Sequence, residues 1–453
     1  MYFWVLSPIK LGMRNNASLS SLVFRKLFRE FLPLKFVRGW FRSFGPAARR
    51  PQKVTSYDLV MALIFHMVAG AGTLAQHLKT LTGETISESA LSQRRESWPW
   101  QIFEQILEFA LRCKADEKKH PEAFYHGLRL CAADGSSFSV ANTPQIKKKM
   151  RKAKSRRGQA AFAKVGVAVL LELGLRNPIA AAVGPRAESE MALSRQLLDK
   201  LPEKSLFLAD RYYGVPVLLI ELKKIHPSGQ REFLVRAKGT LKRRVLEVYR
   251  DGSALVEIRA GKDKMLVREI TGQVRKGQAS WSQVRLWTSL LDWKKHPAGE
   301  LLALYARRWE QESFYRELKV DLRSAPLLKS HTPLTAAQEI AALILAYSIL
   351  VDERIKAAKV GEVPVLRISF LKTLEALRGL WQFLEVTQDL LDERGVRLAV
   401  QRTLRLIAER AVPKRRARSC PRAVRQPVSS WARLKKNTAT NAQPEYKISP
   451  ISK

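Results

Sequence analysis

The segment GLRLCAADGSSFSV, residues 127–140, is where the sequence changes from a helical to a strand-like pattern. Leu128 and Leu130 alternate with other residues at the period of a β-strand. The apolar run then ends on Asp134, which is followed by a glycine and two serines. We therefore expect a strand that places an acid where the strand gives way to a loop.

Strand-like runs continue downstream of this segment. Residues 161–174 and 178–185 are apolar and are separated by the turn signal LRNP, so three consecutive antiparallel strands are expected. The elements predicted next are a helix over 189–201, a short apolar strand over 205–210 that ends on Asp210, a helix over 215–224 and a strand over 231–238. This order predicts an α/β fold in which helices flank a mixed sheet.

The composition divides the chain into five predicted regions. These are a helical N-terminal domain (1–120), the first part of the α/β core (121–237), a β-rich insertion (238–292), a helical second part of the core (293–411) and a basic tail (412–453). The tail has no acid between Glu409 and Glu445, so we expect it to be disordered and to bind phosphates non-specifically. A solvated tail without a function is the alternative.

The N-terminal region contains the outline of a helix-turn-helix. A helix over Leu74–Leu81 ends at Gly83, and Thr85 followed by Glu88 has the spacing of a capping box that opens a second helix. The second helix carries Arg94 and Arg95, which we expect to contact DNA. Two ordinary helices of a small bundle would give the same pattern, so both interpretations stay open.

The charge of the chain points to a polyanionic partner. Lys and Arg number 80 against 41 Asp and Glu, which gives a formal net charge of +39 among 453 residues. Such a surplus costs self-repulsion in the folded state, and a nucleic acid or an anionic surface would relieve it. A second basic stretch, KKKMRKAKSRRG (147–158), follows the first strand and is expected to lie over DNA near Asp134, unless it is a solvated loop. Charge alone names no reaction.

Other classes of protein receive little support. The longest apolar run, Ile340–Val351, is short and follows Gln338 and Glu339, so we expect a buried helix and no membrane span. Three scattered cysteines and seven scattered histidines give no zinc spacing. We expect a cytoplasmic protein.

The segment YARRWEQESFYRELK, residues 305–319, carries an unusual concentration of charge. On an ideal helix with Tyr305 at 0°, Arg308, Glu312 and Lys319 fall at about 300°, 340° and 320°, so four polar side chains share one face. Glu310 and Glu317 fall at roughly 140° and 120°, away from it. An ion-paired surface helix would explain this segment alone. Two acids at strand ends, where α/β sheets place ligand sites, favour a site that binds metal and phosphate.

These residues resemble the DDE transposases of bacterial insertion sequences, a group marked by Tyr, two residues, Arg, three residues, Glu, six residues and Lys. Tyr305, Arg308, Glu312 and Lys319 fit that spacing, and DGS at Asp134 and DRYYG at Asp210 resemble the other two acidic motifs of the family. The resemblance covers about residues 128–350. The chain departs from the family pattern at Gln311, where an apolar residue is usual, which puts the packing of this helix in question.

The resemblance implies an RNase H-like core with a β-rich insertion between the second Asp and the Glu. It implies that Asp134, Asp210 and Glu312 are the catalytic residues and hold two Mg²⁺ ions, for which Mn²⁺ can substitute. The residues implied to bind DNA or phosphate are Tyr305, Arg308 and Lys319, with Arg211 beside Asp210. Trp287 or Trp281, in the insertion, is a candidate for stacking on a flipped base.

The function implied is that of a transposase that binds the terminal inverted repeats of its own element, cuts the strands and joins them to target DNA. Its partner would be double-stranded DNA, it would act as a dimer when bound, and it would lie in the bacterial cytoplasm on the nucleoid. Two alternatives stay open: a DNA-binding relic without activity, and a nuclease or RNA-binding protein on the same fold.

Overall fold

Six helices precede the first strand in the part of the chain that the structure describes. The computed structural model describes residues 19–412, apart from 47–51, 151, 153, 156–157, 186–187, 228–229, 275–281 and 324. The six helices are α1 (Leu19–Phe31), α2 (Leu34–Phe44), α3 (Ser56–Ala69), α4 (Leu74–Thr82), α5 (Glu88–Glu96) and α6 (Trp100–Ala110). The basic tail after Val412 therefore lies outside the described residues.

The predicted pair of helices is present as α4 and α5, but its second cap differs from the prediction. Helix α4 ends at Gly83 in the left-handed conformation, as a terminal glycine allows. The N-cap of α5 is Ser87, whose side chain accepts from the backbone N–H of Ala90, so the predicted capping box at Thr85 is wrong. Glu88 instead accepts a hydrogen bond from the backbone N–H of Ala75 and ties α5 to α4.

The predicted mixed sheet has the strand order β6-β5-β2-β7-β8 at its centre. The strands are β2 (Leu128–Ser139), β5 (Lys164–Glu172), β6 (Asn177–Gly184), β7 (Ser205–Ala209) and β8 (Arg231–Arg236), with the short β1 (Phe124–Tyr125) paired to β2. The first three pair antiparallel, and β7 and β8 run parallel to β2. Three antiparallel strands joined to two parallel ones in this order are the RNase H-like topology, which confirms the predicted fold class.

The predicted insertion extends the same sheet. Its strands are β9 (Arg244–Val248), β10 (Ala254–Ala260), β11 (Asp263–Val274) and β12 (Ser282–Thr288). Strand β12 pairs antiparallel with β8, so the insertion continues the core sheet to its far edge. Trp287 is fully buried and donates to Glu269, so the prediction that it stacks on a base is wrong. Trp281 lies outside the described residues.

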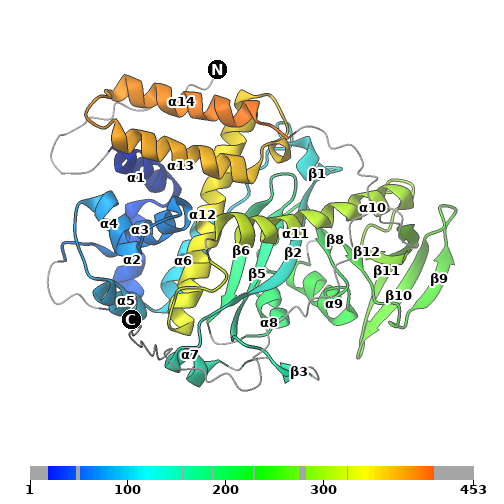
Figure 1. The fold of residues 1–453 in the computed structure, drawn as a ribbon. Coiled ribbons are helices and arrows are strands. Elements are labelled where there is room, and N and C mark those ends of the chain that lie inside the picture. The colour runs from blue at the N-terminus through cyan, green and yellow to red at the C-terminus, as the bar shows by residue number, and fades with distance from the viewer. Residues whose placement is uncertain are drawn as a thin grey trace, which may run out of the picture.

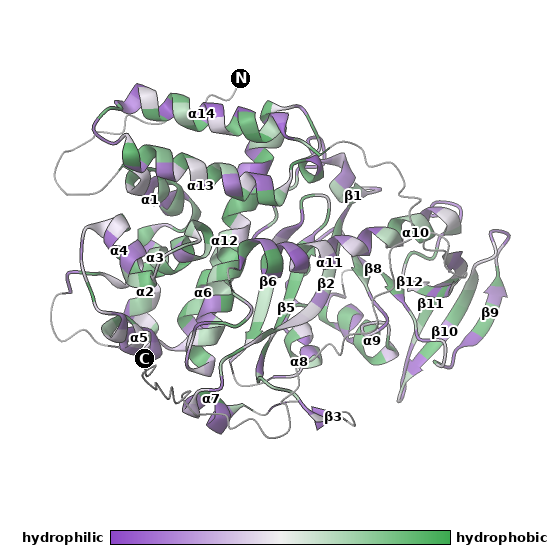
Figure 2. Cartoon of the chain, in the orientation of Figure 1, coloured by the Kyte–Doolittle hydropathy of each residue, from purple (hydrophilic) through white to green (hydrophobic). Residues whose placement is uncertain are grey.

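Helices cover both faces of the core sheet (Figure 1). Alternate residues of β2, β5 and β7 enter two separate hydrophobic clusters, as the period of a strand requires. On one face lie α11 (Trp309–Arg316) and α12 (Pro333–Val360), and on the other α8 (Glu190–Arg195) and α9 (Pro216–Ile225). The hydrophobic colouring of β5 and β6 in Figure 2 marks the strands that these layers enclose.

Helix α12 is the central helix of the molecule. It contacts α3, α6 and the sheet, as well as α13 (Phe370–Val386) and α14 (Glu393–Glu409). By length and hydropathy it could cross a membrane, and α3 with α4 would form a second such segment if the bent pair is counted as one span. However, 89% of its apolar window is buried inside the protein, which is the behaviour of a core helix. The N-terminal helices share its hydrophobic cluster, so the predicted domain boundaries stay predictions.

Candidate active site

The sheet brings Asp134 and Asp210 to the same level. Strands β2 and β7 are parallel neighbours, with Arg129 opposite Ser205 and Ala132 opposite Leu208. Continuing this register by two residues sets Asp134 beside Asp210, just beyond the end of β7. Leu130, Ala132, Leu206 and Leu208 all belong to the cluster on the α11 and α12 side. By strand alternation both aspartates therefore face α11.

Backbone groups hold both aspartates. Asp134 lies within β2, which continues to Ser139, so the prediction that the strand ends at this acid is wrong, whereas Asp210 directly follows β7. One carboxylate oxygen of Asp134 accepts from the N–H of Gly135 at 2.9 Å, and one of Asp210 accepts from the N–H of Tyr212 at 2.7 Å. The turn after Asp210 closes on Gly214, where an added Cβ would lie 1.9 Å from the carbonyl oxygen of Arg236. The glycine of the DRYYG motif is thus required by the close approach of β8.

The charged segment, together with the helix before it, crosses the middle of β2 and the end of β7. With its flanking residues, it comprises α10 (Ala298–Tyr305), a 3₁₀ turn (Ala306–Arg308), α11 and a π-helical segment (Glu317–Leu322). Tyr305 donates to the carbonyl of Ala209 at 3.3 Å, and Tyr315 to the carbonyl of Asp134 at 2.8 Å. Lys319 donates to the hydroxyl of Ser136 at 2.5 Å and to the carbonyl of Ser137 at 2.9 Å. These bonds dock the segment on the residues that surround the two aspartates.

Gln311 is a polar residue on the side of α11 that packs against the sheet, and a hydrogen bond accommodates it there. Its side chain is fully buried, and its amide nitrogen donates to the carbonyl oxygen of Val169 at 3.0 Å. Val169 is the residue that pairs with Asp134 across β2 and β5. A hydrogen bond to the sheet therefore replaces the apolar contact that the family pattern favours at this position.

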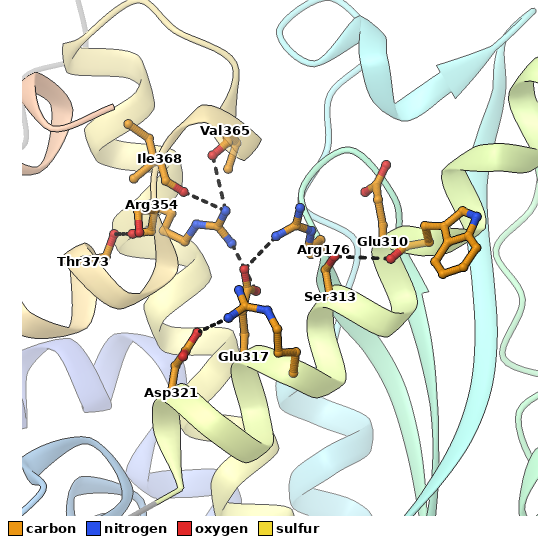
Figure 3. Close-up of polar contacts among 12 residues, drawn as sticks. Arg176, Glu310, Ser313, Glu317, Asp321, Arg354, Val365, Ile368 and Thr373 are labelled. Carbon is orange, nitrogen blue, oxygen red and sulfur yellow. Dashed lines mark hydrogen bonds and ion pairs between the residues drawn. The ribbon is translucent and has the colours of Figure 1, made fainter. Parts of the chain in front are cut away.

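A buried ion cluster anchors the far side of the segment (Figure 3). Glu317 is 3% exposed and accepts from Arg176 and from the hydroxyl of Tyr347, both at 2.6 Å, with Arg354 at 4.0 Å. Glu310 is also buried and accepts from the backbone N–H of Gly174 at 2.8 Å. Both glutamates that the helical spacing excluded from the site thus have structural roles.

Glu312 does not join the two aspartates in this structure. Its side chain is 46% exposed and forms an ion pair with Arg308 at 3.0 Å, the partner expected four residues away on a helix. Within the described residues, no group of three His, Cys, Asp or Glu side chains is close enough to hold a metal ion. Arg308 itself lies within electrostatic range of Asp134. The signature residues therefore gather around the aspartates, while the carboxylate of Glu312 is turned to its arginine.

The electrostatics of the site show uncompensated negative charge. Burial, with a smaller contribution from the neighbouring Asp210 and Glu190, raises the pKa of Asp134 to about 7, against the lowering effects of the Gly135 hydrogen bond and Arg308. Burial lowers the pKa of Lys319 to about 8, helped by Arg323 and Lys164. A carboxyl group that holds its proton near neutral pH is one that a divalent cation would stabilise in its ionised form.

Glu190 is a member of this region that the sequence did not reveal. It begins α8, on the opposite face of the sheet, and its side chain lies directly over Gly135. A Cβ added at Gly135 would lie 2.3 Å from its Cγ and 2.6 Å from its Oε1. Burial and Asp210 raise the pKa of Glu190. Its only signal in the sequence is a Ser-Glu pair at the start of a predicted helix, which is also an ordinary helix start.

The donors present fit a hard divalent cation at the aspartate pair. Both aspartates offer a carboxylate oxygen that receives no backbone N–H, and oxygen donors of this kind suit Mg²⁺ or Mn²⁺. Glu312 is one helical segment away and would have to leave Arg308 to contribute. The site therefore contains two of the three predicted ligands in place and the third in an ion pair.

The other predicted DNA-binding residues lie elsewhere or point inward. Arg211 is exposed beside Asp210, so its contact with phosphate stays a prediction. Arg94 donates to the carbonyl of Val54 at 2.6 Å, and Arg95 donates to Thr335 and to Gln338. These bonds engage both guanidinium groups within the protein, because α5 packs against the start of α3 and of α12. This geometry is at odds with the predicted role of Arg94 and Arg95 as a DNA-reading pair.

Comparison with known proteins defines the class. The family model described as the transposase DDE domain matches residues 125–349, which span β1, the core sheet, the insertion and most of α12. These residues belong to the family that this domain defines.

The individual relatives are a transposase of an insertion sequence and a putative transposase. Over 281 residues the chain is 25% identical to the transposase InsG for insertion sequence element IS4 of Escherichia coli (strain K12), a match that covers 60% of this chain and 62% of InsG. It is 23% identical over 207 residues to the putative transposase InsZ of the same organism, covering 44% and 68%. The match thus spans less than two thirds of InsG. A solved piggyBac transposase synaptic complex with hairpin DNA aligns over 84% of this chain and 85% of that one, at 10% identity and a TM-score of 0.40.

Proposed function

We propose that this protein is an active DNA transposase that cuts the ends of its own insertion sequence and joins them to target DNA. The observation that carries the proposal is the register of β2 and β7, which sets Asp134 and Asp210 side by side beneath the segment that holds Tyr305, Arg308, Glu312 and Lys319. The reaction class is metal-dependent phosphoryl transfer, with Mg²⁺ or Mn²⁺ held by Asp134, Asp210 and Glu312.

The residues of the segment have separate parts in this proposal. When bound, the metal supplies activation of the attacking oxygen and neutralises charge on the leaving oxygen. Arg308 and Lys319 would bind phosphates of the DNA strand, because both are cations close to the two aspartates. Tyr305, hydrogen-bonded to Ala209, would fix the segment against the end of β7.

Arg308 would also link DNA binding to assembly of the acidic triad. Its ion pair with Glu312 keeps that carboxylate from the aspartates. A DNA phosphate that takes over Arg308 would free Glu312, and the three acids would then come together only on substrate. A dimer that brings two transposon ends together, in the bacterial cytoplasm on the nucleoid, completes the proposal.

Strand cleavage and joining test this function directly. The measurement uses full-length protein, a labelled duplex that carries the terminal inverted repeat of the element, a target plasmid, and Mg²⁺ or Mn²⁺. We expect nicked and joined products from the wild type, and loss of at least 100-fold, an order-of-magnitude figure for removing a group that stabilises the transition state, in Asp134→Ala, Asp210→Ala and Glu312→Ala.

Asp389→Ala is the matched control, since Asp389 is an exposed acid on the turn after α13. DNA binding without cleavage by the wild type would identify a relic, and cleavage without joining would identify a nuclease. Activity that survives in any of the three acidic variants would contradict the assigned roles.

A further inference from the structure

A groove in the N-terminal region has the properties of a binding site for the DNA backbone. It has a volume of about 470 Å³ and lies between α2, the start of α3 and the end of α5. Phe41 and Trp98 pack edge to face at its base, with ring centroids 4.8 Å apart. Polar side chains along the walls, including Ser56 and Ser97, are potential donors to phosphate oxygens.

Among the residues that the structure describes, three arginines line this groove and no acidic residue does. They are Arg38 and Arg42 of α2 and Arg94 of α5. Asp58, on the first turn of α3, does not line the groove, because its carboxylate caps Thr55 and lies 3.9 Å from Arg25. Three other cavities in the described part of the chain each include a glutamate: Glu96 in one, Glu104 and Glu108 in the second, and Glu339 in the third.

The two arginines of α2 are available to a ligand. Arg38 and Arg42 are exposed, stand four residues apart on one face of the helix, and have no ion pair with any carboxylate in the described residues. Lys35, three residues before Arg38, extends the same exposed basic face, and α2 contains no acid. By contrast, the guanidinium of Arg94 donates hydrogen bonds to the carbonyl of Val54 and the hydroxyl of Ser56, so this side chain lines the groove in a fixed position.

We propose that this groove binds the phosphodiester backbone of duplex DNA, with Arg38 and Arg42 as the contacting cations. The inference rests on the proposed function, which makes DNA the partner. It assigns the DNA-binding surface of the N-terminal region to α2, where the sequence had predicted α5. Two exposed cations on one helix face, at a groove that no carboxylate lines among the described residues, can each contact a phosphate, and their contribution is independent of base sequence. The surface thus positions the protein on DNA and reads no bases.

The test measures affinity as a function of salt, with full-length protein and a fluorescent 30-base-pair duplex of random sequence. For the wild type, log K falls linearly with log salt, and each lost phosphate contact lowers the slope by about 0.9. We expect Arg38→Ala with Arg42→Ala to lower the slope by about 1.8, which corresponds to binding weakened by about 60-fold at 0.1 M salt relative to the effect at 1 M. Arg38→Lys with Arg42→Lys should keep most of the slope, because the charges remain.

The matched control is Arg402→Ala with Arg405→Ala, two exposed arginines on α14 that remove the same net charge. A wild-type slope in the α2 variant, or an equal loss in the α14 variant, would overturn the proposal, since the effect would then be absent or due to net charge alone. The assay needs no metal and no cleavage. Slope loss in a protein that never cuts DNA would contradict the proposed enzyme and leave this surface intact, whereas a wild-type slope in an α2 variant of a protein that cuts DNA would overturn this surface and leave the enzyme intact.

Discussion

At the scale of single residues, the active site is defined by a carboxyl group placed where it is hard to ionise. Asp134 is buried beside Asp210, and its pKa of about 7 lies above the ordinary value of 3.8. Between these two values the folded state binds more protons at this group than the unfolded state does. The free energy of unfolding therefore falls as pH rises through that window, and the loss is complete above about pH 7.

Asp134→Asn should remove this pH dependence. In EDTA, the variant should match the wild type near pH 4 and be more stable than it at pH 8, by no more than about 4 kcal/mol, the upper bound for a shift of this size. Urea unfolding at the two pH values measures the difference. Asp389→Asn, on an exposed acid, should show no such trend. An advantage of Asp134→Asn that is equal at both pH values would argue against the raised pKa.

Arg95 gives a second prediction, because its guanidinium joins α5 to α12. Arg95→Ala should lower the free energy of unfolding by roughly 2–4 kcal/mol, since it removes buried hydrogen bonds to Gln338 and Thr335. The folded variant should bind DNA as the wild type does. Unfolding in urea and DNA affinity measured on the same preparation check both statements. Unchanged stability with weakened DNA binding would restore the helix-turn-helix interpretation.

The same residues show what a sequence can reveal about single side chains. Asp134 and Asp210 were predictable because each ends an apolar run, and strand register then brings them together. The inward direction of Arg95 was not predictable, because it depends on how α5 packs against a helix more than 200 residues away. Glu190 was hidden for the same reason, since only the fold sets it over Gly135.

At the scale of secondary structure, the segment from α10 to the π-helical turn holds the signature residues. An ideal α-helix placed Tyr305, Arg308, Glu312 and Lys319 on one face, but the actual segment is interrupted by a 3₁₀ turn after Tyr305 and ends with a π-helical turn. The departures from α-helical geometry could not be read from periodicity, because they follow from docking on β2 and on α12. π-Helical turns often occur at functional sites, and this one carries Lys319.

The buried cluster around Glu317 should hold this segment in place. Glu317→Ala should destabilise the protein by about 3–5 kcal/mol, because Arg176 and Arg354 would lose their buried counter-charge. The matched control is Glu375→Ala, which breaks the exposed pair with Lys372 and should cost no more than about 1 kcal/mol. Chemical unfolding of the three proteins provides the comparison. Equal costs for the buried and the exposed pair would show that the cluster does not anchor the segment.

At the scale of the whole molecule, the helical N-terminal region and the α/β core are joined by α12. The order of strands and helices was predictable from periodicity, and so was the insertion between the second Asp and the Glu. The shared core was not, because the contacts of α12 with α3 and α6 link residues far apart in the chain. The excess of positive charge is likewise a property of the entire chain, and it affects the stability of the folded state.

Duplex DNA should stabilise this protein in a salt-dependent way. A net charge of +39 opposes the compact state, and a polyanion that binds the folded form relieves that repulsion and shifts unfolding by mass action. We expect the melting temperature at 50 mM salt to rise by several degrees when a random-sequence duplex is added at about 100 times its dissociation constant, which corresponds to about 2.7 kcal/mol. At 0.5 M salt the rise should vanish, because screening and counter-ion competition remove the attraction.

Differential scanning fluorimetry measures the melting temperature at both salt concentrations, with neutral dextran as the control polymer. A rise that persists at 0.5 M salt would mean that contacts other than charge dominate DNA binding, and no rise at 50 mM would mean that the surplus has another use.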